Sequence, residues 1–115
     1  MKILKNNMST PENQNRFKAA VFQALSDPIR LEIIAYLRDG EKCVCQIVPQ
    51  LNLIQPLVSR HLKILKDAGI VRCRKDGTKR LYSIVDPRIF NVADALTGEL
   101  VKTLTKEAFE NAFCT

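Results

Sequence analysis

Residues 44–85, VCQIVPQLNLIQPLVSRHLKILKDAGIVRCRKDGTKRLYSIV, decide the fold. Their first part predicts a short helix over 44–51, a tight turn at 52–54 and a second helix over 55–68. Gly69 follows the second helix where a left-handed C-cap is expected. The stretch therefore opens with two short helices joined by a turn.

The second part of the same stretch changes from a helical period to a period of two. Apolar and basic residues alternate over 70–75 and again over 79–84, on either side of Asp76-Gly77. Alternation around an Asp-Gly pair predicts a β-hairpin. Helix, turn, helix and basic hairpin in this order predict a winged helix-turn-helix.

The flanking segments add helices on both sides of this unit. We expect residues 1–10 to be a short, polar and flexible N-terminal arm, and residues 11–115 to form one domain. Apolar spacing predicts helices over 11–25 and 87–113, and Asp27-Pro28 starts a further helix that ends at Asp39-Gly40. We expect a mainly α fold with a small β-hairpin. The apolar stripe over 87–113 exceeds what so small a domain can bury, so we expect a homodimer through 11–25 and 87–113.

The net charge of +6 is confined to one block of the chain. Residues 55–80 hold eight basic and two acidic residues, and the other 89 residues hold ten of each. Such a local excess of positive charge is typical of a surface that binds a polyanion, most often nucleic acid. We therefore expect a double-stranded DNA partner.

The second helix of a helix-turn-helix enters the major groove with its N-terminal residues leading. On this helix the candidate DNA contacts are Gln55, Ser59, Arg60, His61 and Lys63. Arg60 can pair with guanine and Gln55 with adenine. His61, the only histidine, could donate to a phosphate, but beside Leu62 a structural hydrogen bond is the alternative. On the hairpin the candidates are Arg74, Lys75, Lys79 and Arg80, placed for the backbone or the minor groove.

Length and composition exclude several classes of protein. The chain has 115 residues, which is one domain, and no apolar run approaches the ~20 residues that cross a bilayer. The N-terminus resembles no signal peptide, so we expect a cytoplasmic protein with reduced cysteines. With one histidine, no Cys-x-x-Cys and only four glycines, we expect neither an enzyme nor a small-molecule substrate.

Two motifs resemble a known family. Residues 24–31, ALSDPIRL, resemble the opening of the ArsR/SmtB metal-sensing repressors, and residues 58–71, VSRHLKILKDAGIV, are similar to their recognition helix and its exit into the wing. The similarity covers about residues 17–85. It implies a homodimeric winged-helix repressor that leaves its operator when an inducer binds.

A third motif, residues 41–48 (EKCVCQIV), resembles the ELCVCDLC box of arsenic-responsive members. This resemblance implies that Cys43 and Cys45 bind As(III) or Sb(III), whereas the third ligand position of the box is Val48. Thiolates select soft ions, so Cd, Pb or Zn would also suit the site. We expect the third ligand to be Cys114, with Cys73 buried as a small hydrophobe. Both thiols can ligate only where the backbone between them is not regular helix.

Three other functions compete with an ion sensor. Oxidation of Cys43 with Cys45, or of Cys45 with Cys114, would make the chain a repressor that senses redox or sulfur species. A thiol enzyme or metal carrier is a further alternative, but the sequence has no second histidine and no Cys-x-x-Cys to support it, and measurable turnover would be needed to establish it. A winged helix used for protein contact would lack salt-sensitive affinity for DNA.

Overall fold

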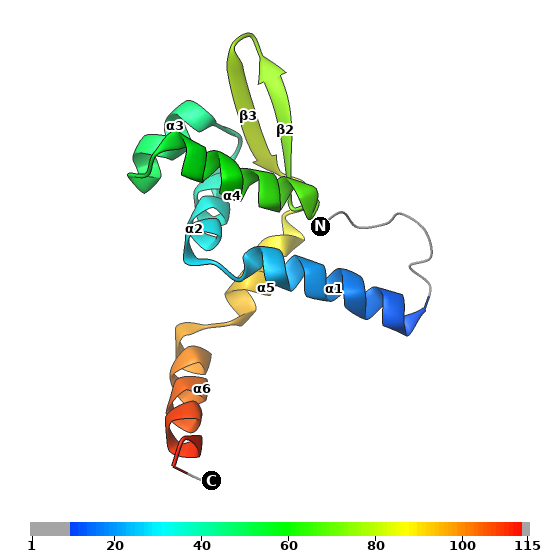
Figure 1. The fold of residues 1–115 in the computed structure, drawn as a ribbon, viewed down its shortest axis with the longest axis vertical. Helices are drawn as coiled ribbons and strands as arrows, with labels where there is room; N and C mark the ends of the chain where they lie inside the picture. Colours follow the sequence, from blue (N-terminus) through cyan, green and yellow to red (C-terminus); the bar gives the residue numbers. More distant parts are fainter. Residues whose placement is uncertain (1–9, 114–115) are drawn as a thin grey trace.

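The computed structural model describes residues 10–113 of the chain. The elements are, in order, α1 (Pro11–Leu25), α2 (Pro28–Tyr36), the 3-10 turn η1 (Leu37–Asp39), β1 (Lys42–Cys43), α3 (Val44–Leu51), α4 (Gln55–Asp67), β2 (Val71–Asp76), β3 (Lys79–Ile84), α5 (Arg88–Ala95) and α6 (Gly98–Asn111). This order confirms a mainly helical winged helix-turn-helix. In Figure 1, α4 crosses in front of α2, the hairpin of β2 and β3 rises beyond α4, and α6 leads away from the body.

Local sequence signals fix the ends of the helices. Asp27 caps α2, since its Oδ1 accepts from the backbone N–H of Ile29 at 2.8 Å and of Arg30 at 3.3 Å. Asn52 closes α3 in the left-handed conformation, with φ of 54°. Gly69 follows α4 with φ of +77°, a value that favours glycine, so the expected C-cap is confirmed.

One hydrophobic core holds the body together. Val58, Leu62 and Leu65 of α4 have no exposed surface, and they pack with Ile33 of α2 and Ile47 of α3. The remaining core residues come from the end of α1, from α2 and η1, from the segment before β2, from the sheet and from α5; they are Ala24, Leu25, Ile34, Leu37, Ile70, Val71, Tyr82 and Phe90. Burial of this face fixes α4 against the body and leaves its opposite face in solvent.

The sheet has one more strand than the sequence predicts. The hairpin of β2 and β3 is confirmed, with Asp76 opposite Lys79 and Gly77 at φ of +63° in the turn. The additional strand, β1, pairs antiparallel with β3, so that β3 lies in the centre of the order β1-β3-β2. A strand of only two residues carries no period, which is why the sequence pattern did not reveal it.

The single helix predicted over 87–113 is wrong, because the structure divides it into α5 and α6. Leu96 leaves the helical region, and Thr97 starts a new helix with a side chain that accepts from the N–H of Leu100 at 3.1 Å. Gly98, a weak helix former, follows directly. Because the apolar stripe continues through the break, the sequence pattern predicted one helix where the structure has two.

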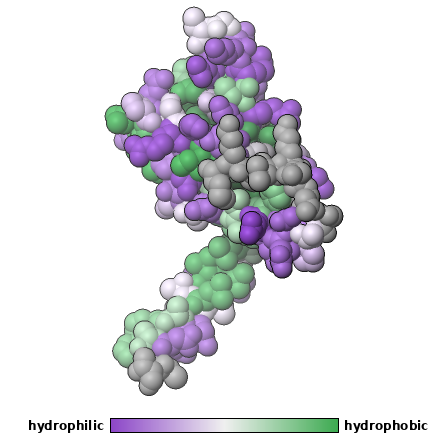
Figure 2. All heavy atoms as spheres, turned by 45° about the vertical axis from the view of Figure 1, so that its right-hand side comes forward, coloured by the Kyte–Doolittle hydropathy of each residue, from purple (hydrophilic) through white to green (hydrophobic). Residues whose placement is uncertain are grey.

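α5 is fixed to the body, whereas α6 is not. Phe90 of α5 lies in the core, and the Arg38 guanidinium stacks 4.4 Å from its ring and pairs with Asp94 at 2.9 Å. None of the α6 residues, all of which the structure describes, is buried. Figure 2 shows apolar surface on the stalk formed by the C-terminal helices. No helix within residues 10–113 is both long and apolar enough to cross a membrane.

Candidate nucleic-acid interface and thiol pair

A groove of about 880 Å³ lies between the helix-turn-helix and the hairpin. Helices α3 and α4 form one wall, and the turn and first part of β3 form the other. Five predicted DNA contacts line it together: Gln55, Ser59, Lys63, Lys79 and Arg80. Lys66 and Thr78 also line it but were not among the predicted contacts, although Lys66 belongs to the basic block. The groove is therefore positively charged along both walls.

The other predicted DNA contacts are placed differently. Arg60 and Lys75 are exposed but do not line the groove. Lys63 pairs with Asp67 one helical turn away, at 2.8 Å, and this contact lowers the pKa of the Asp67 carboxyl. An exposed pair of this kind is weak, so it leaves Lys63 available to a phosphate.

His61, for which both a DNA contact and a structural role are predicted, does not line the groove. The side chain is on the buried face of α4, with 8% of the residue exposed. Its Nδ1 lies 3.1 Å from the Arg30 guanidinium, which also donates to the backbone carbonyl of Ala24 at 2.6 Å. Because Arg30 can only donate, Nδ1 is the acceptor. His61 thus joins the recognition helix to the junction of α1 and α2, which is the structural alternative weighed for this residue.

Arg74, another predicted DNA contact, pairs with an acidic residue. Its Nε and Nη2 donate to the two carboxylate oxygens of Glu41 at 2.9 and 2.8 Å. The hydrogen bond from Arg74 lowers the pKa of Glu41, and the one to Glu41 raises the pKa of Arg74. A bidentate pair fixes the guanidinium in one orientation. The two residues are 33 positions apart, so no local motif indicated their contact.

Cys43 and Cys45 meet at the N-terminus of α3. Cys43 is the N-cap, extended at φ −71° and ψ 148°, and its Sγ accepts from the N–H of Cys45 at 3.0 Å. The Gln46 side chain accepts in turn from the N–H of Cys43 at 2.9 Å, which completes a capping box. Only Cys43 lies outside the helix, since Val44 and Cys45 already belong to α3.

The structure joins the sulfurs of Cys43 and Cys45 as a disulfide, whereas the sequence predicts reduced cysteines. The extended N-cap brings their Cα atoms to 5.0 Å, within the range that disulfides need. Both cysteines line the groove beside Gln55 and Ser59. Cys43 is buried and Cys45 is exposed.

The two remaining cysteines lie elsewhere. Cys73 is half-buried against the core and forms a hydrogen bond with Tyr82. Burial of Tyr82, and secondly this hydrogen bond, raise the pKa of Tyr82 to about 12. The predicted ligand Cys114 lies outside the described residues. Within residues 10–113, no group of three or more His, Cys, Asp or Glu side chains is placed to hold a metal ion. The part of the chain that the structure describes therefore provides a two-thiol site.

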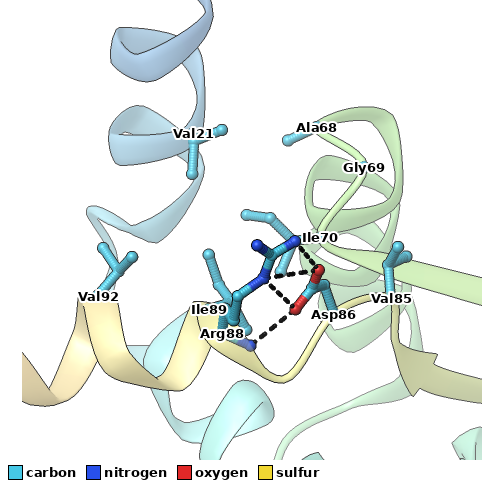
Figure 3. Close-up of a pocket in the computed structure, with 9 residues that line it drawn as sticks. All are labelled: Val21, Ala68, Gly69, Ile70, Val85, Asp86, Arg88, Ile89 and Val92. Atoms are coloured by element: carbon cyan, nitrogen blue, oxygen red, sulfur yellow. Dashed lines mark hydrogen bonds and ion pairs between the residues drawn. The ribbon is translucent and has the colours of Figure 1, made fainter.

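A second, apolar surface lies on the side of α1 and α5. A hollow of about 290 Å³ separates Val21 of α1 from Ile89 and Val92 of α5, and the Asp86–Arg88 ion pair borders it (Figure 3). Exposed apolar residues continue from this hollow along α5 and α6: Val92, Leu96, Leu100, Val101, Leu104, Phe109 and Phe113. An apolar surface of this extent is typical of an interface.

Residues 27–72 match the family described as bacterial regulatory protein, arsR family. An uncharacterized HTH-type transcriptional regulator of Methanocaldococcus jannaschii is 50% identical over 72 residues, 62% of this chain and 81% of that protein. An arsenical resistance operon repressor of Staphylococcus xylosus is 39% identical over 66 residues, 57% of this chain and 64% of that protein. The chain spans 53% to 64% of the length of three repressors it matches.

One solved structure gives the same picture for the fold. The homodimeric winged helix-turn-helix DNA-binding domain of a possible ArsR-family transcriptional regulator from Mycobacterium bovis superposes with a TM-score of 0.73 at 25% identity. The match covers 87% of this chain and 95% of that domain. All three of these relatives are named as regulators, and none of the three is named as an enzyme.

Proposed function

Because the chain belongs to the ArsR family of bacterial regulatory proteins, we propose that it is a homodimeric repressor released from double-stranded DNA by a thiophilic ion at Cys43 and Cys45. As(III) or Sb(III) is the proposed inducer. One observation carries the proposal: the basic residues suited to DNA and the two thiols line a single groove. A change at the thiols therefore occurs on the surface that would meet the duplex.

The DNA-binding part rests on the exposed face of α4 and on the hairpin. Gln55, Ser59 and Lys63 lie on one wall of the groove, and Lys79 and Arg80 lie on the other. Each copy in the dimer would place α4 in a major groove, with the two α4 helices about 34 Å apart. The lysines and arginines would displace counterions, so affinity would fall steeply with salt.

The homodimer part rests on the apolar surface of α1, α5 and α6. In a monomer this surface would expose the hollow beside Val21 and Val92 together with Leu100 and Leu104. A second copy presents the same surface, as a two-fold interface requires. Pairing of two copies would cover these residues and fix the distance between their two α4 helices.

The residues at the thiol site fit a soft ion in part. Two sulfurs converge at the start of α3, and soft ions prefer thiolate ligands. Val48, at the third position of the arsenic box, lines the same groove but has no donor atom. Reduced Cys43 and Cys45 would hold the ion. Binding would take the Cys43 sulfur from its capping contact with the N–H of Cys45 and so disturb the start of α3.

Binding to DNA can be tested without knowledge of the operator. Wild-type protein selects duplexes of about three helical turns from a random library, and the best duplex is then titrated at several salt concentrations. We expect selection of a two-fold symmetric site and a strong loss of affinity with salt. Failure to enrich any duplex would refute the DNA-binding part of the proposal.

Sodium arsenite tests the ion site on the selected duplex. We expect arsenite to release reduced wild-type protein and to leave Cys43→Ser bound. Cys73→Ser is the matched control, because Cys73 lies on β2 and does not line the groove. Mass spectrometry would count the arsenic atoms per dimer. If arsenite releases neither wild type nor Cys43→Ser, or releases both equally, the ion site is refuted.

A redox switch is the second candidate function, and the proximity of the Cys43 and Cys45 sulfurs favours it. In that reaction the two thiols lose two electrons and two protons to hydrogen peroxide, which is reduced to two waters. Peroxide would then release the DNA without metal uptake, and dithiothreitol would restore binding. Release by arsenite but not by peroxide would refute the redox candidate.

A further inference from the structure

We propose that Glu41 is a positioning residue that holds the wing, the hairpin of β2 and β3, in its DNA-binding pose by its contact with Arg74. This inference rests on the proposed function and adds the route from the thiol pair to the DNA. It also gives Arg74 a different role from the DNA contact predicted from the sequence. The argument starts from the place of Cys43 in the sheet.

Cys43 belongs to the sheet of the wing and also caps the N-terminus of α3. As part of β1 it pairs with Leu81 of β3, and Leu81 pairs on its other side with Arg74 of β2. Cys43, Leu81 and Arg74 therefore form one row across the three strands. A displacement of the Cys43 backbone acts directly on the central strand of the wing.

The Glu41–Arg74 pair joins the two outer strands of the same sheet. Glu41 directly precedes β1, and Arg74 lies in β2, so their bidentate contact spans the central strand β3. The side chains are 31% and 60% exposed, but two parallel hydrogen bonds define their geometry. Together with the β1–β3 pairing, this contact fixes the wing to the segment that carries the thiol pair.

Charge and geometry make opposite predictions for Glu41. An acid beside the basic wing repels DNA, so on charge alone Glu41→Gln would strengthen binding. If Glu41 positions the wing, the same variant weakens binding because Lys79 and Arg80 lose their alignment with α4. The sign of the effect therefore separates the two roles.

The experiment uses full-length protein and the duplex selected by wild type. We expect Glu41→Gln to weaken affinity about fivefold, the lower end of typical coupling between sites. The matched control is Asp76→Asn, which removes an acid from the wing itself and should bind equally well or more tightly. The charge swap Glu41→Arg with Arg74→Glu should recover most of the loss, since it restores the pair with the net charge unchanged.

The inference is overturned if Glu41→Gln binds as tightly as wild type or more tightly. It is also overturned if the swap binds no better than Arg74→Gln alone, because Arg74 would then contact DNA itself. Thermal unfolding of each variant reports any loss of folded protein. Failure of wild type to select a duplex would instead refute the proposed function.

A second readout tests the route from the thiol pair. We measure the factor by which arsenite or peroxide, whichever releases wild type, reduces affinity for the selected duplex. Glu41→Gln should reduce this factor, whereas a merely structural loss would lower both affinities and leave the factor unchanged. An unchanged factor would overturn the proposed route.

Discussion

Helices α4 and α6 have nearly the same length, 13 and 14 residues, and both have an apolar face, but only α4 buries it. Val58, His61, Leu62 and Leu65 of α4 are buried within the chain. Leu100, Val101 and Leu104 of α6 are between 41% and 52% exposed. Apolar periodicity thus identifies an apolar face of a helix, but not whether the chain itself buries that face.

The largest expected effect is on the buried face of α4. Leu62→Ala removes a side chain with no exposed surface, and we expect it to lower the free energy of unfolding by ~2–5 kcal/mol. Denaturant titration measures this loss. Leu104→Ala on α6 is the matched control, expected to cost far less at protein concentrations where the monomer dominates. Equal losses would show that the two faces do not differ.

Charged substitutions on α6 should break the dimer without unfolding the body. Replacing both Leu100 and Leu104 with Glu places two charges on the proposed interface, and we expect at least a hundredfold weaker dimerisation, equivalent to ~2.7 kcal/mol. Analytical ultracentrifugation measures the dissociation constant. Lys102→Glu makes the same change in net charge on another face of α6, so it controls for charge. A dimer unaffected by the double substitution would place the interface elsewhere.

A smaller effect is expected at the buried polar group of α4. His61→Leu leaves Nη1 of the Arg30 guanidinium without its His61 acceptor, and we expect a loss of ~1–3 kcal/mol in unfolding free energy. Arg60→Ala, one residue earlier and exposed, should leave stability unchanged but weaken binding to the selected duplex. The opposite result for the two variants would reverse our assignment of the faces.

The smallest expected effect is on the pH dependence of stability, and it arises at Asp86, just before α5. The hydrogen bond from the Arg88 side chain lowers the pKa of Asp86 to about 2. Because the folded pKa lies below the unfolded value, the contribution of Asp86 is present above about pH 4 and is lost as pH falls toward about 2. Asp86→Asn should flatten the pH dependence of unfolding in this window. An unchanged slope in the variant would show that other carboxylates dominate.

Most of the fold could be predicted because its signals are local. The cap at Asp27, the left-handed Gly69 and the change of period after it each act within a few residues of the structure they determine. β1 and the break before Thr97 could not be predicted. β1 exists only because Lys42 and Cys43 meet a strand that begins far along the chain, and the break interrupts an otherwise continuous apolar stripe.

In the candidate site, too, some residues could be predicted from local sequence and others could not. Gln55, Ser59, Lys63, Lys79 and Arg80 line one groove, as their type and spacing indicated. His61 and Arg74 belong to the same basic block, but their partners, Arg30 and Glu41, lie 31 and 33 positions away. The concentration of basic residues in the sequence predicts which surface is positively charged. The role of each charged side chain depends on partners that are distant in the chain. The ion ligands remain a prediction, since Cys114 lies outside the described residues.

The break between α5 and α6 gives the chain a modular construction. Every residue of the hydrophobic core cluster lies between Ala24 and Phe90, so this core is complete before Thr97. If the proposed homodimer forms through α6, residues 10–95 without α6 would contact DNA as a single copy and lose the gain in avidity that two joined copies provide. In the proposed homodimer, changes in the length and composition of α6 would therefore alter the pairing of the two copies and leave the groove between α4 and the hairpin unchanged.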